Sequence, residues 1–179
     1  MIYFDNSSTT KPYKEVVDSF VTVSTKYFGN PSSLHGLGAT SENLLSQARK
    51  QAAGLLQVKE QEIYFTSGGT EGNNIAIKGV AMAFQSRGKH IITSAIEHAS
   101  VLEPCKQLES FDFDVTYVPV DAEGRVSAED VIQAVRPDTI LVSIMQVNNE
   151  IGTIQPIEEI GAFLKKKDKI FFHVDYVQG

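Results

Sequence analysis

Residues 63–71 read Ile-Tyr-Phe-Thr-Ser-Gly-Gly-Thr-Glu, and the arrangement of the rest of the chain is interpreted from this stretch. The apolar run at 63–65 predicts a short β-strand, the two glycines a tight turn, and Glu71 opens a segment with helical spacing. Where a strand leads through a turn into a helix, free backbone N–H groups and the positive end of the helix dipole converge on one point. A phosphate can bind there. Because Gly-Gly is also ordinary turn chemistry, the remaining chain must decide between the two interpretations.

Composition narrows the class of protein. The 179 residues suffice for one domain with a substantial core, and 42% apolar with 21% charged residues is typical of a globular protein. A formal net charge of −6 disfavours a nucleic-acid partner, and no apolar run approaches the roughly 20 residues that span a bilayer. The single cysteine excludes an intrachain disulfide and suits a reducing compartment. We therefore expect a cytoplasmic protein that contacts neither nucleic acid nor membrane.

The order of patterns predicts the fold class. A β-like entry at 2–4 precedes two amphipathic helices, about 16–27 and 44–56, for which we expect core or interface packing rather than chemistry. From residue 63 apolar β-runs alternate with helical segments, which implies an α/β fold with a mostly parallel sheet and helices on both faces. The expected strands are 63–66, 90–93, 115–120, 140–145 and 170–174. The expected helices are 71–85, 99–109, one that Ser127 caps and that ends at Arg136, and 156–167. The chain stops soon after the last strand, so we expect further sequence to complete the sheet.

Polar residues follow the strands where ligands of such sheets bind, at the carboxyl ends. They are Ser67–Thr70, Glu97, His98, Gln146, Asn148–Glu150, Asp175 and Gln178. His98 alone suits the first turn of a helix, and the two asparagines suit a turn. Asp175 is different, because a carboxylate at the end of an apolar strand loses solvent and needs a cationic or hydrogen-bonding partner. A phosphate cradle, an imidazole, amides and a carboxylate are thus expected at one edge.

Other kinds of site are disfavoured by the sequence. The four histidines are scattered and lack neighbours at metal-ligand spacing, so we expect no metal site. Cys105 falls inside an expected helix, and packing is its expected role. Motifs of triad hydrolases, P-loop enzymes and dinucleotide-binding proteins are absent.

Taken together, the motifs resemble those of the cysteine desulfurases, pyridoxal-phosphate enzymes of the class V aminotransferase fold. The matching stretches are residues 3–6 with 9–10, 28–33, 65–71, 96–98, 148–156 and 173–178, in the family's order and spacing along essentially the whole chain. Ser7-Ser8 departs from the usual Asn-Ala, Tyr176 from a small residue and Gly179 from Ala or Ser. The resemblance implies a truncated large domain of the fold type I transferases, incomplete over 16–179, with residues 1–15 belonging to a small domain.

The resemblance also assigns cofactor contacts to residues of this chain. They are Gly69, Thr70, His98, Asn149, Asp175 and Gln178. The first two would bind the phosphate, and His98 would stack on the pyridine ring and serve in proton transfer. Asp175 would pair with the protonated ring nitrogen, and the two amide side chains would hydrogen-bond the phenolic oxygen.

In this family a mobile cysteine thiolate takes sulfur from L-cysteine, alanine leaves, and the persulfide passes to iron–sulfur cluster or thiolation partners. The family's Schiff-base lysine and nucleophilic cysteine would both lie beyond Gly179, so we expect the 179 residues to be inactive alone. A homodimer and a sulfur-acceptor or scaffold partner are implied. The alternatives are another enzyme of the fold, such as a selenocysteine lyase or a kynureninase-like enzyme, or a non-catalytic binding or scaffold protein.

Overall fold

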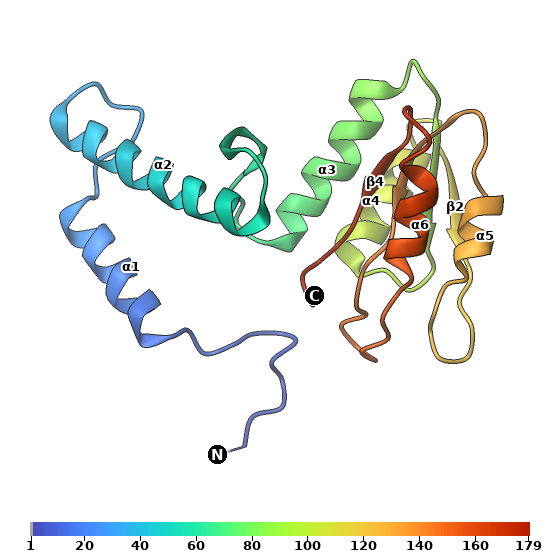
Figure 1. Ribbon diagram of the computed structural model, residues 1–179, viewed down its shortest axis with the longest axis horizontal. Coiled ribbons are helices and arrows are strands. Elements are labelled where there is room, and N and C mark those ends of the chain that lie inside the picture. Colours follow the sequence, from blue (N-terminus) through green and yellow to red (C-terminus); the bar gives the residue numbers. More distant parts are fainter. Residues whose placement is uncertain (1) are drawn as a thin grey trace. The chain divides into compact units, whose positions relative to one another are not determined.

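The computed structural model describes residues 2–179, which divide into a unit that ends at Phe65 and a unit that begins at Thr66 (Figure 1). The first unit contains α1 (Lys14–Lys26), α2 (Gly36–Leu56) and the short 3₁₀ helix η1 (Glu60–Glu62). The elements of the second unit are α3 (Gly69–Phe84), β1 (His90–Ser94), α4 (Ala99–Glu109), β2 (Asp114–Val118), α5 (Ala128–Gln133), β3 (Thr139–Ser143), α6 (Ile157–Leu164) and β4 (Phe171–His173).

The second unit is built on a parallel four-stranded sheet in the order β2-β1-β3-β4. Ile91 is paired with Val115 on one side and with Leu141 on the other, which places β1 and β3 at the centre. All five residues of each central strand are buried. The predicted α/β class, the parallel sheet and the four strands from residue 90 onward are therefore confirmed.

Alternate side chains of the central strands supply two separate cores. Ile91 and Leu141 pack with residues of α3 and α4, whereas Ile92 and Val142 pack with residues of α5 and α6. Successive side chains of a strand point to opposite faces, so a strand covered on both faces favours consecutive apolar residues, such as Ile91 with Ile92 and Leu141 with Val142. The result is the predicted three-layer arrangement, with one helix pair on each face of the sheet (Figure 1).

Helix α5 shows how local sequence sets an element's start. Ser127 accepts a hydrogen bond from the backbone N–H of Asp130 at 3.2 Å, as its position before the helix predicts. The helix ends at Gln133, short of the predicted end at Arg136. The hydroxyl of Thr139 accepts the N–H of Arg136 at 2.8 Å, so this N–H bonds outside the helix.

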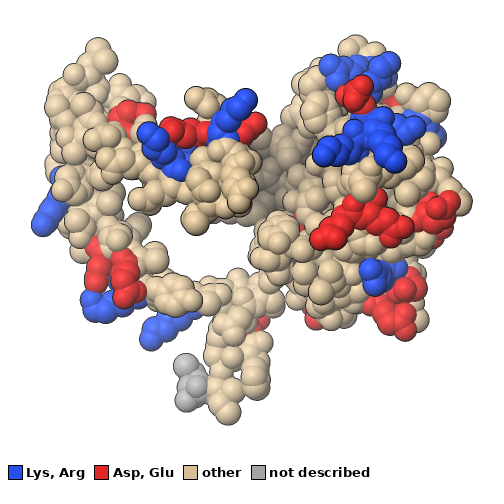
Figure 2. Space-filling model, in the orientation of Figure 1, with Lys and Arg blue, Asp and Glu red and all other residues tan. Residues whose placement is uncertain are grey.

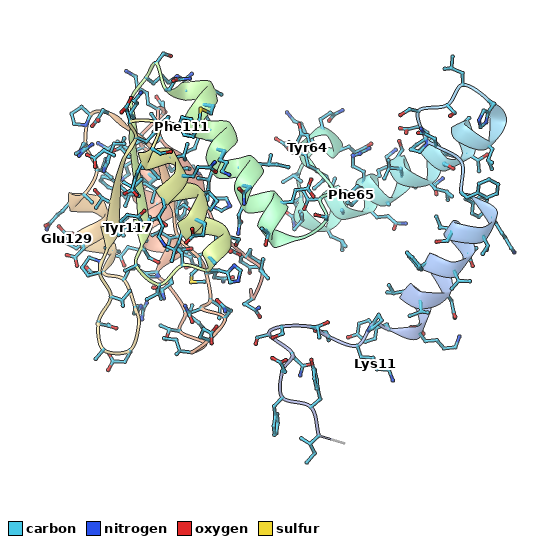
Figure 3. All side chains as sticks on the ribbon, turned by 180° about the vertical axis from the view of Figure 1, so that it is seen from behind. Lys11, Tyr64, Phe65, Phe111, Tyr117 and Glu129 are labelled. Carbon is cyan, nitrogen blue, oxygen red and sulfur yellow. The ribbon has the colours of Figure 1, made fainter. Side chains whose placement is uncertain are left out.

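The strand predicted at 63–66 is wrong. These residues follow η1 without regular structure, and no strand among residues 2–179 pairs with them. Tyr64 is 82% exposed and Phe65 53% exposed, and both side chains can be followed in Figure 3. A strand needs a neighbour for its backbone hydrogen bonds, and apolar composition alone does not supply one. The same reasoning applies to residues 2–4, which are irregular rather than β-like.

The first unit does not use its helices as a buried core. Helix α1 has no buried residue, and Phe20 on its apolar face is 72% exposed. Helix α2 buries only Gly38 and Ala53. Core packing, one of the two roles expected for these helices, is therefore wrong for α1, and interface packing stays a prediction.

Charge is unevenly distributed over the second unit. Figure 2 shows Lys and Arg side chains gathered near the chain between α6 and β4. Arg136, Lys167 and Lys169 line a hollow of about 470 Å³ before the starts of β3 and β4. This end is opposite to the carboxyl ends of the strands. Among residues 2–179, no helix has both the length and the apolar character needed to cross a bilayer.

Candidate functional site

The sheet has a switch point between β1 and β3. The connection from β1 to β2 runs through α4 on one face, and the connection from β3 to β4 runs through α6 on the other. The loops after β1 and β3 therefore diverge, and ligands of open α/β sheets bind where this happens. Glu97 and His98 follow β1, and Asn148 and Asn149 follow β3, so the sequence places polar groups at this point.

Two buried side chains join these loops. Glu97 accepts hydrogen bonds at Oε1 from the hydroxyl of Ser94 at 2.7 Å and from the N–H of Met145 at 2.9 Å. Asn148 donates from Nδ2 to the carbonyl of Ile96 at 2.9 Å. The loops are thus fixed to each other across the switch point by hydrogen bonds of two buried side chains.

The Oε2 atom of Glu97 is buried and has no hydrogen-bond partner among the described residues. Burial raises the pKa of this carboxyl to about 7, although the bonds from Ser94 and Met145 act in the opposite direction. The negative charge of Asp175 acts in the same direction as burial and contributes to this pKa. Glu97 is therefore partly protonated at neutral pH, and the buried region around the site avoids carrying two full carboxylate charges.

The turn before α3 is held by its own acid. The hydroxyl of Ser67 and then its backbone N–H donate to the carboxylate of Glu71, and these two bonds lower the pKa of Glu71. The following N–H groups, at Gly69 and Thr70, belong to the first turn of α3, where a helix provides no acceptor. A Cβ atom at Gly69 would lie 2.7 Å from Cγ2 of Val177, so glycine permits close approach of the chain after β4.

Asp175 is buried, with 7% of its surface exposed. Its Oδ1 accepts the N–H of Val177 at 3.0 Å, and its Oδ2 accepts Nδ2 of Asn73 at 2.8 Å. The prediction that this carboxylate needs donor partners is confirmed. Within residues 2–179 no ion pair includes Asp175. Its remaining lone pairs can accept a proton-bearing cationic group.

His98 caps the N-terminus of α4 with its side chain. Its Nδ1 accepts the N–H of Ser100 at 3.1 Å and lies 2.8 Å from the hydroxyl oxygen of Ser100. His98 and Thr70 both line a hollow of about 480 Å³ between α3 and α4. The sequence suggested that His98 lies in the first turn of its helix, and the observed position directly before α4 is close to this. Its imidazole ring also lines the hollow.

The remaining two predicted cofactor contacts are Asn149 and Gln178. Asn149 is partly exposed, and its amide donates to Oε1 of Glu150 at 3.2 Å. Its position depends on Asn148, whose Oδ1 accepts the N–H groups of Glu150 and Ile151 and so fixes the turn. Gln178 is half-buried, in a turn in which the N–H of Gly179 donates to the carbonyl of Tyr176.

The predicted set did not include Asn73 and Ser100, which connect its members. Asn73, Ile77 and Ala81 are the buried residues of α3 and follow one another at intervals of four. An asparagine at a core position of a helix is the signal that could have identified it, because a buried amide must find partners. Ile75, an apolar residue of the same helix, is 58% exposed, so apolar character alone does not identify the buried face.

Cys105 is fully buried within α4, in the core shared with α3. Burial raises the pKa of its thiol to about 12, and the nearby acids Glu97 and Glu109 act in the same direction. The observation agrees with the packing role expected from sequence and makes this thiol a poor nucleophile.

The fold and the site together define an α/β protein with a helix start, an imidazole and a buried carboxylate near the carboxyl ends of its parallel strands. The chain belongs to the class-V aminotransferase family, which matches residues 2–179. It is 55% identical to the cysteine desulfurase IscS of Methanosarcina thermophila over 177 residues, which are 99% of this chain and 44% of that protein. The chain thus spans less than half the length of this relative.

Solved structures give the same assignment. A NifS-like protein superposes with a TM-score of 0.95 at 43% identity, covering 99% of this chain and 49% of that one. A structure described as SspA in complex with cysteine gives a TM-score of 0.91 at 44% identity, covering 96% of this chain and 49% of that one. The cofactor of class-V aminotransferases and cysteine desulfurases is pyridoxal 5′-phosphate, as expected from the resemblance.

The residues present fit this cofactor chemically. Asp175 is a buried carboxylate without a cation among the described residues, and a protonated pyridine nitrogen is a cation with one proton to donate. The first turn of α3 offers N–H groups to a phosphate, and Gly69 keeps this turn clear of a side chain that would meet Val177.

Proposed function

We propose that this chain is part of a pyridoxal-phosphate-dependent cysteine desulfurase. The enzyme would remove sulfur from L-cysteine, giving L-alanine and an enzyme-bound persulfide for iron–sulfur cluster or thiolation pathways. The similarity to the desulfurase of M. thermophila over 99% of the chain supports this reaction, as does the similarity to a structure that contains cysteine.

The observation that carries the proposal is the buried Asp175 carboxylate with two hydrogen-bond donors and no cation among residues 2–179. Pyridoxal phosphate supplies an electron sink whose strength depends on a protonated ring nitrogen. Asp175 would hold the proton on that nitrogen. Asn73 and the N–H of Val177 keep the carboxylate in place for this task.

The other residues would position the cofactor and the substrate. Gly69 and Thr70 would bind the phosphate through the N–H groups at the start of α3 and the threonine hydroxyl. His98 would pack against the pyridine ring. Asn149 and Gln178 would donate hydrogen bonds to the phenolic oxygen, and Asn149 would also lie near the substrate carboxylate.

The remaining expectations form part of the same proposal. They are a cytoplasmic homodimer, a sulfur-acceptor or scaffold partner, and a small domain that includes residues 1–15, with the large domain starting at residue 16. We also propose that residues 1–179 do not turn over cysteine alone. No lysine in them follows a Ser/Thr-x-His motif, and Cys105 is buried.

The test is alanine formation from L-cysteine. A longer protein that contains this chain and the downstream lysine and cysteine is expected to form alanine and persulfide, and the 179 residues alone are not. Selenocysteine and kynurenine serve as competing substrates. Preference for either one, or no reaction with any of the three, would reject the desulfurase, and steady alanine formation by the 179 residues would reject the assignment of the missing groups.

A further inference from the structure

Four polar groups form one continuous chain of hydrogen bonds beside the candidate site. The chain starts at Nδ1 of His98, which lies 2.8 Å from Oγ of Ser100. Oγ of Ser100 is 2.9 Å from Nδ2 of Asn73, and the same Nδ2 is 2.8 Å from Oδ2 of Asp175. These bonds connect the imidazole after β1 with the carboxylate after β4 through two residues, Ser100 of α4 and Asn73 of α3.

The direction of these bonds follows from the amide of Asn73. Its Nδ2 carries two protons and can only donate, so one proton goes to Asp175 and the other to Ser100. The reverse orientation would place the amide oxygen against a carboxylate oxygen, two acceptors with no proton between them. Since Oγ of Ser100 accepts from the amide, its own proton is free to be donated to Nδ1 of His98.

A backbone hydrogen bond independently indicates that Nδ1 of His98 carries no proton. The N–H of Ser100 points at Nδ1 of His98 at 3.1 Å, as part of the cap of α4. A nitrogen that accepts from an N–H carries no proton of its own. A neutral His98 must therefore carry its proton on Nε2.

We infer that Asn73 and Ser100 are positioning residues, which fix His98 as an Nε2–H donor and hold Asp175 as an acceptor-only carboxylate. The identity of the ligand that receives these two groups rests on the function proposed above. His98 then offers a bound ligand its ring face and one donor, and no ring acceptor.

This arrangement restricts proton transfer by His98. To act as a base at Nε2, the ring needs its proton on Nδ1, and to act as an acid it needs protons on both nitrogens. In either case Nδ1 must first release the N–H and the hydroxyl of Ser100. In the hydrogen-bonded state His98 therefore does not transfer a proton. The bonds from Ser100 to Nδ1 must break before His98 can do so.

The tautomer can be measured without cofactor or activity. Side-chain ¹⁵N NMR of the 179-residue protein is expected to show His98 with an unprotonated Nδ1 and a protonated Nε2. In Ser100→Ala the Nδ1 resonance should move toward that of an unbonded imidazole nitrogen, and Ser100→Thr, which keeps the hydroxyl, should retain the original position. An Nδ1–H signal in the unmodified protein, or an Nδ1 resonance unaffected by Ser100→Ala, would overturn the inference.

Asn73→Leu provides the second variant, with Asn74→Leu as its matched control on the same helix. Asn74 donates to the carbonyl of Thr70 and lies outside the hydrogen-bond chain. Asn73→Leu should move the His98 Nδ1 resonance as Ser100→Ala does, because the hydroxyl is no longer oriented, and Asn74→Leu should not. Equal effects of the two leucine variants would contradict a positioning role for Asn73.

A titration with pyridoxal 5′-phosphate separates this inference from the proposed function. The unmodified protein should bind the cofactor, and Asn73→Leu should weaken binding about tenfold or more, the usual effect of losing a hydrogen bond to a charged group. Absence of binding together with the expected NMR signals would reject the proposed function alone. Binding to a protein whose His98 carries its proton on Nδ1 would reject the inference alone.

Discussion

Nδ2 of Asn73 lies 2.8 Å from Oδ2 of Asp175, although 102 positions separate the two residues in the sequence. The bond joins the first turns of α3 to the end of the last strand. Both residues are buried, so the hydrogen bond between the amide and the carboxylate replaces the hydrogen bonds that each would form with water. Removing one partner leaves the other without compensation, which makes this pair sensitive to substitution.

Asp175→Asn is expected to weaken pyridoxal 5′-phosphate binding by about tenfold or more, because a charge-assisted hydrogen bond becomes a neutral one. Absorbance titration of the cofactor measures the change. Asp168→Asn removes an equal charge at the cationic end of the unit, where Asp168 lines the other hollow, and should leave the affinity unchanged. Equal affinities for all three proteins would contradict the assigned pairing.

Glu97→Gln should remove part of the pH dependence of stability. The folded-state pKa of about 7 is above the ordinary 4.5, so the folded chain binds more protons between these values. Stability due to this group is present below pH 4.5 and is lost as pH rises through about 7, by roughly 3 kcal/mol in total. Glutamine keeps the oxygen that accepts from Ser94 and Met145, and it does not titrate.

Urea unfolding at pH 5 and pH 8 tests this expectation. The loss of unfolding free energy between the two pH values should be smaller in the glutamine variant by roughly that amount. His90 and His173, whose pKa values are lowered by burial, change stability in the opposite direction in both proteins and cancel in the comparison. Identical pH profiles would show that Glu97 titrates normally.

Cys105 should resist alkylation in the folded protein. The rise of its pKa from 9.0 to about 12 lowers the thiolate fraction at pH 8 roughly a thousandfold, and burial also blocks access. Mass spectrometry after treatment with iodoacetamide should show little modification in buffer and full modification in urea, which is the control. Rapid modification under native conditions would contradict the packing of this residue.

Two glycine substitutions should change stability in opposite directions. A Cβ at Gly88 would lie 2.1 Å from the carbonyl oxygen of Asp138, so Gly88→Ala should cost about 1–3 kcal/mol. Gly79 is in α3 with nothing within 4 Å of a new Cβ, and Gly79→Ala should add roughly 0.5–1 kcal/mol. Denaturant unfolding measures both, and a Gly88→Ala variant as stable as the Gly79→Ala variant would refute the close contact.

Continuous apolar strands followed by helical spacing were sufficient to predict the sheet from residue 90 onward. Both faces of β1 and β3 are covered, and this environment favours the apolar runs 91–92 and 140–142 in the two strands. Residues 63–66 carry the same local signal and fail as a strand, because pairing depends on a neighbour that a local pattern does not report. The turn and the helix start predicted directly after these residues are present, and α3 begins at Gly69.

The candidate site shows the same limit. The residue types at the strand ends were visible in the sequence, and Asp175 was expected to need donors. Asn73 as its partner was not expected, since no local rule links a helix position to a strand end 102 residues away. The roles of Asn149 and Gln178 came from family resemblance and stay predictions, because the contacts of these side chains within the chain do not test them.

The division of the chain at Thr66 has a consequence for how the sequence can vary. All residues proposed to hold the cofactor, from Gly69 to Gln178, lie on one side of this boundary, together with Asn73 and Ser100. Residues 2–65 contribute none of them. Substitutions in α1 and α2 therefore leave every residue proposed to contact the cofactor unchanged, so the first unit can diverge in sequence while the proposed ligand chemistry stays the same.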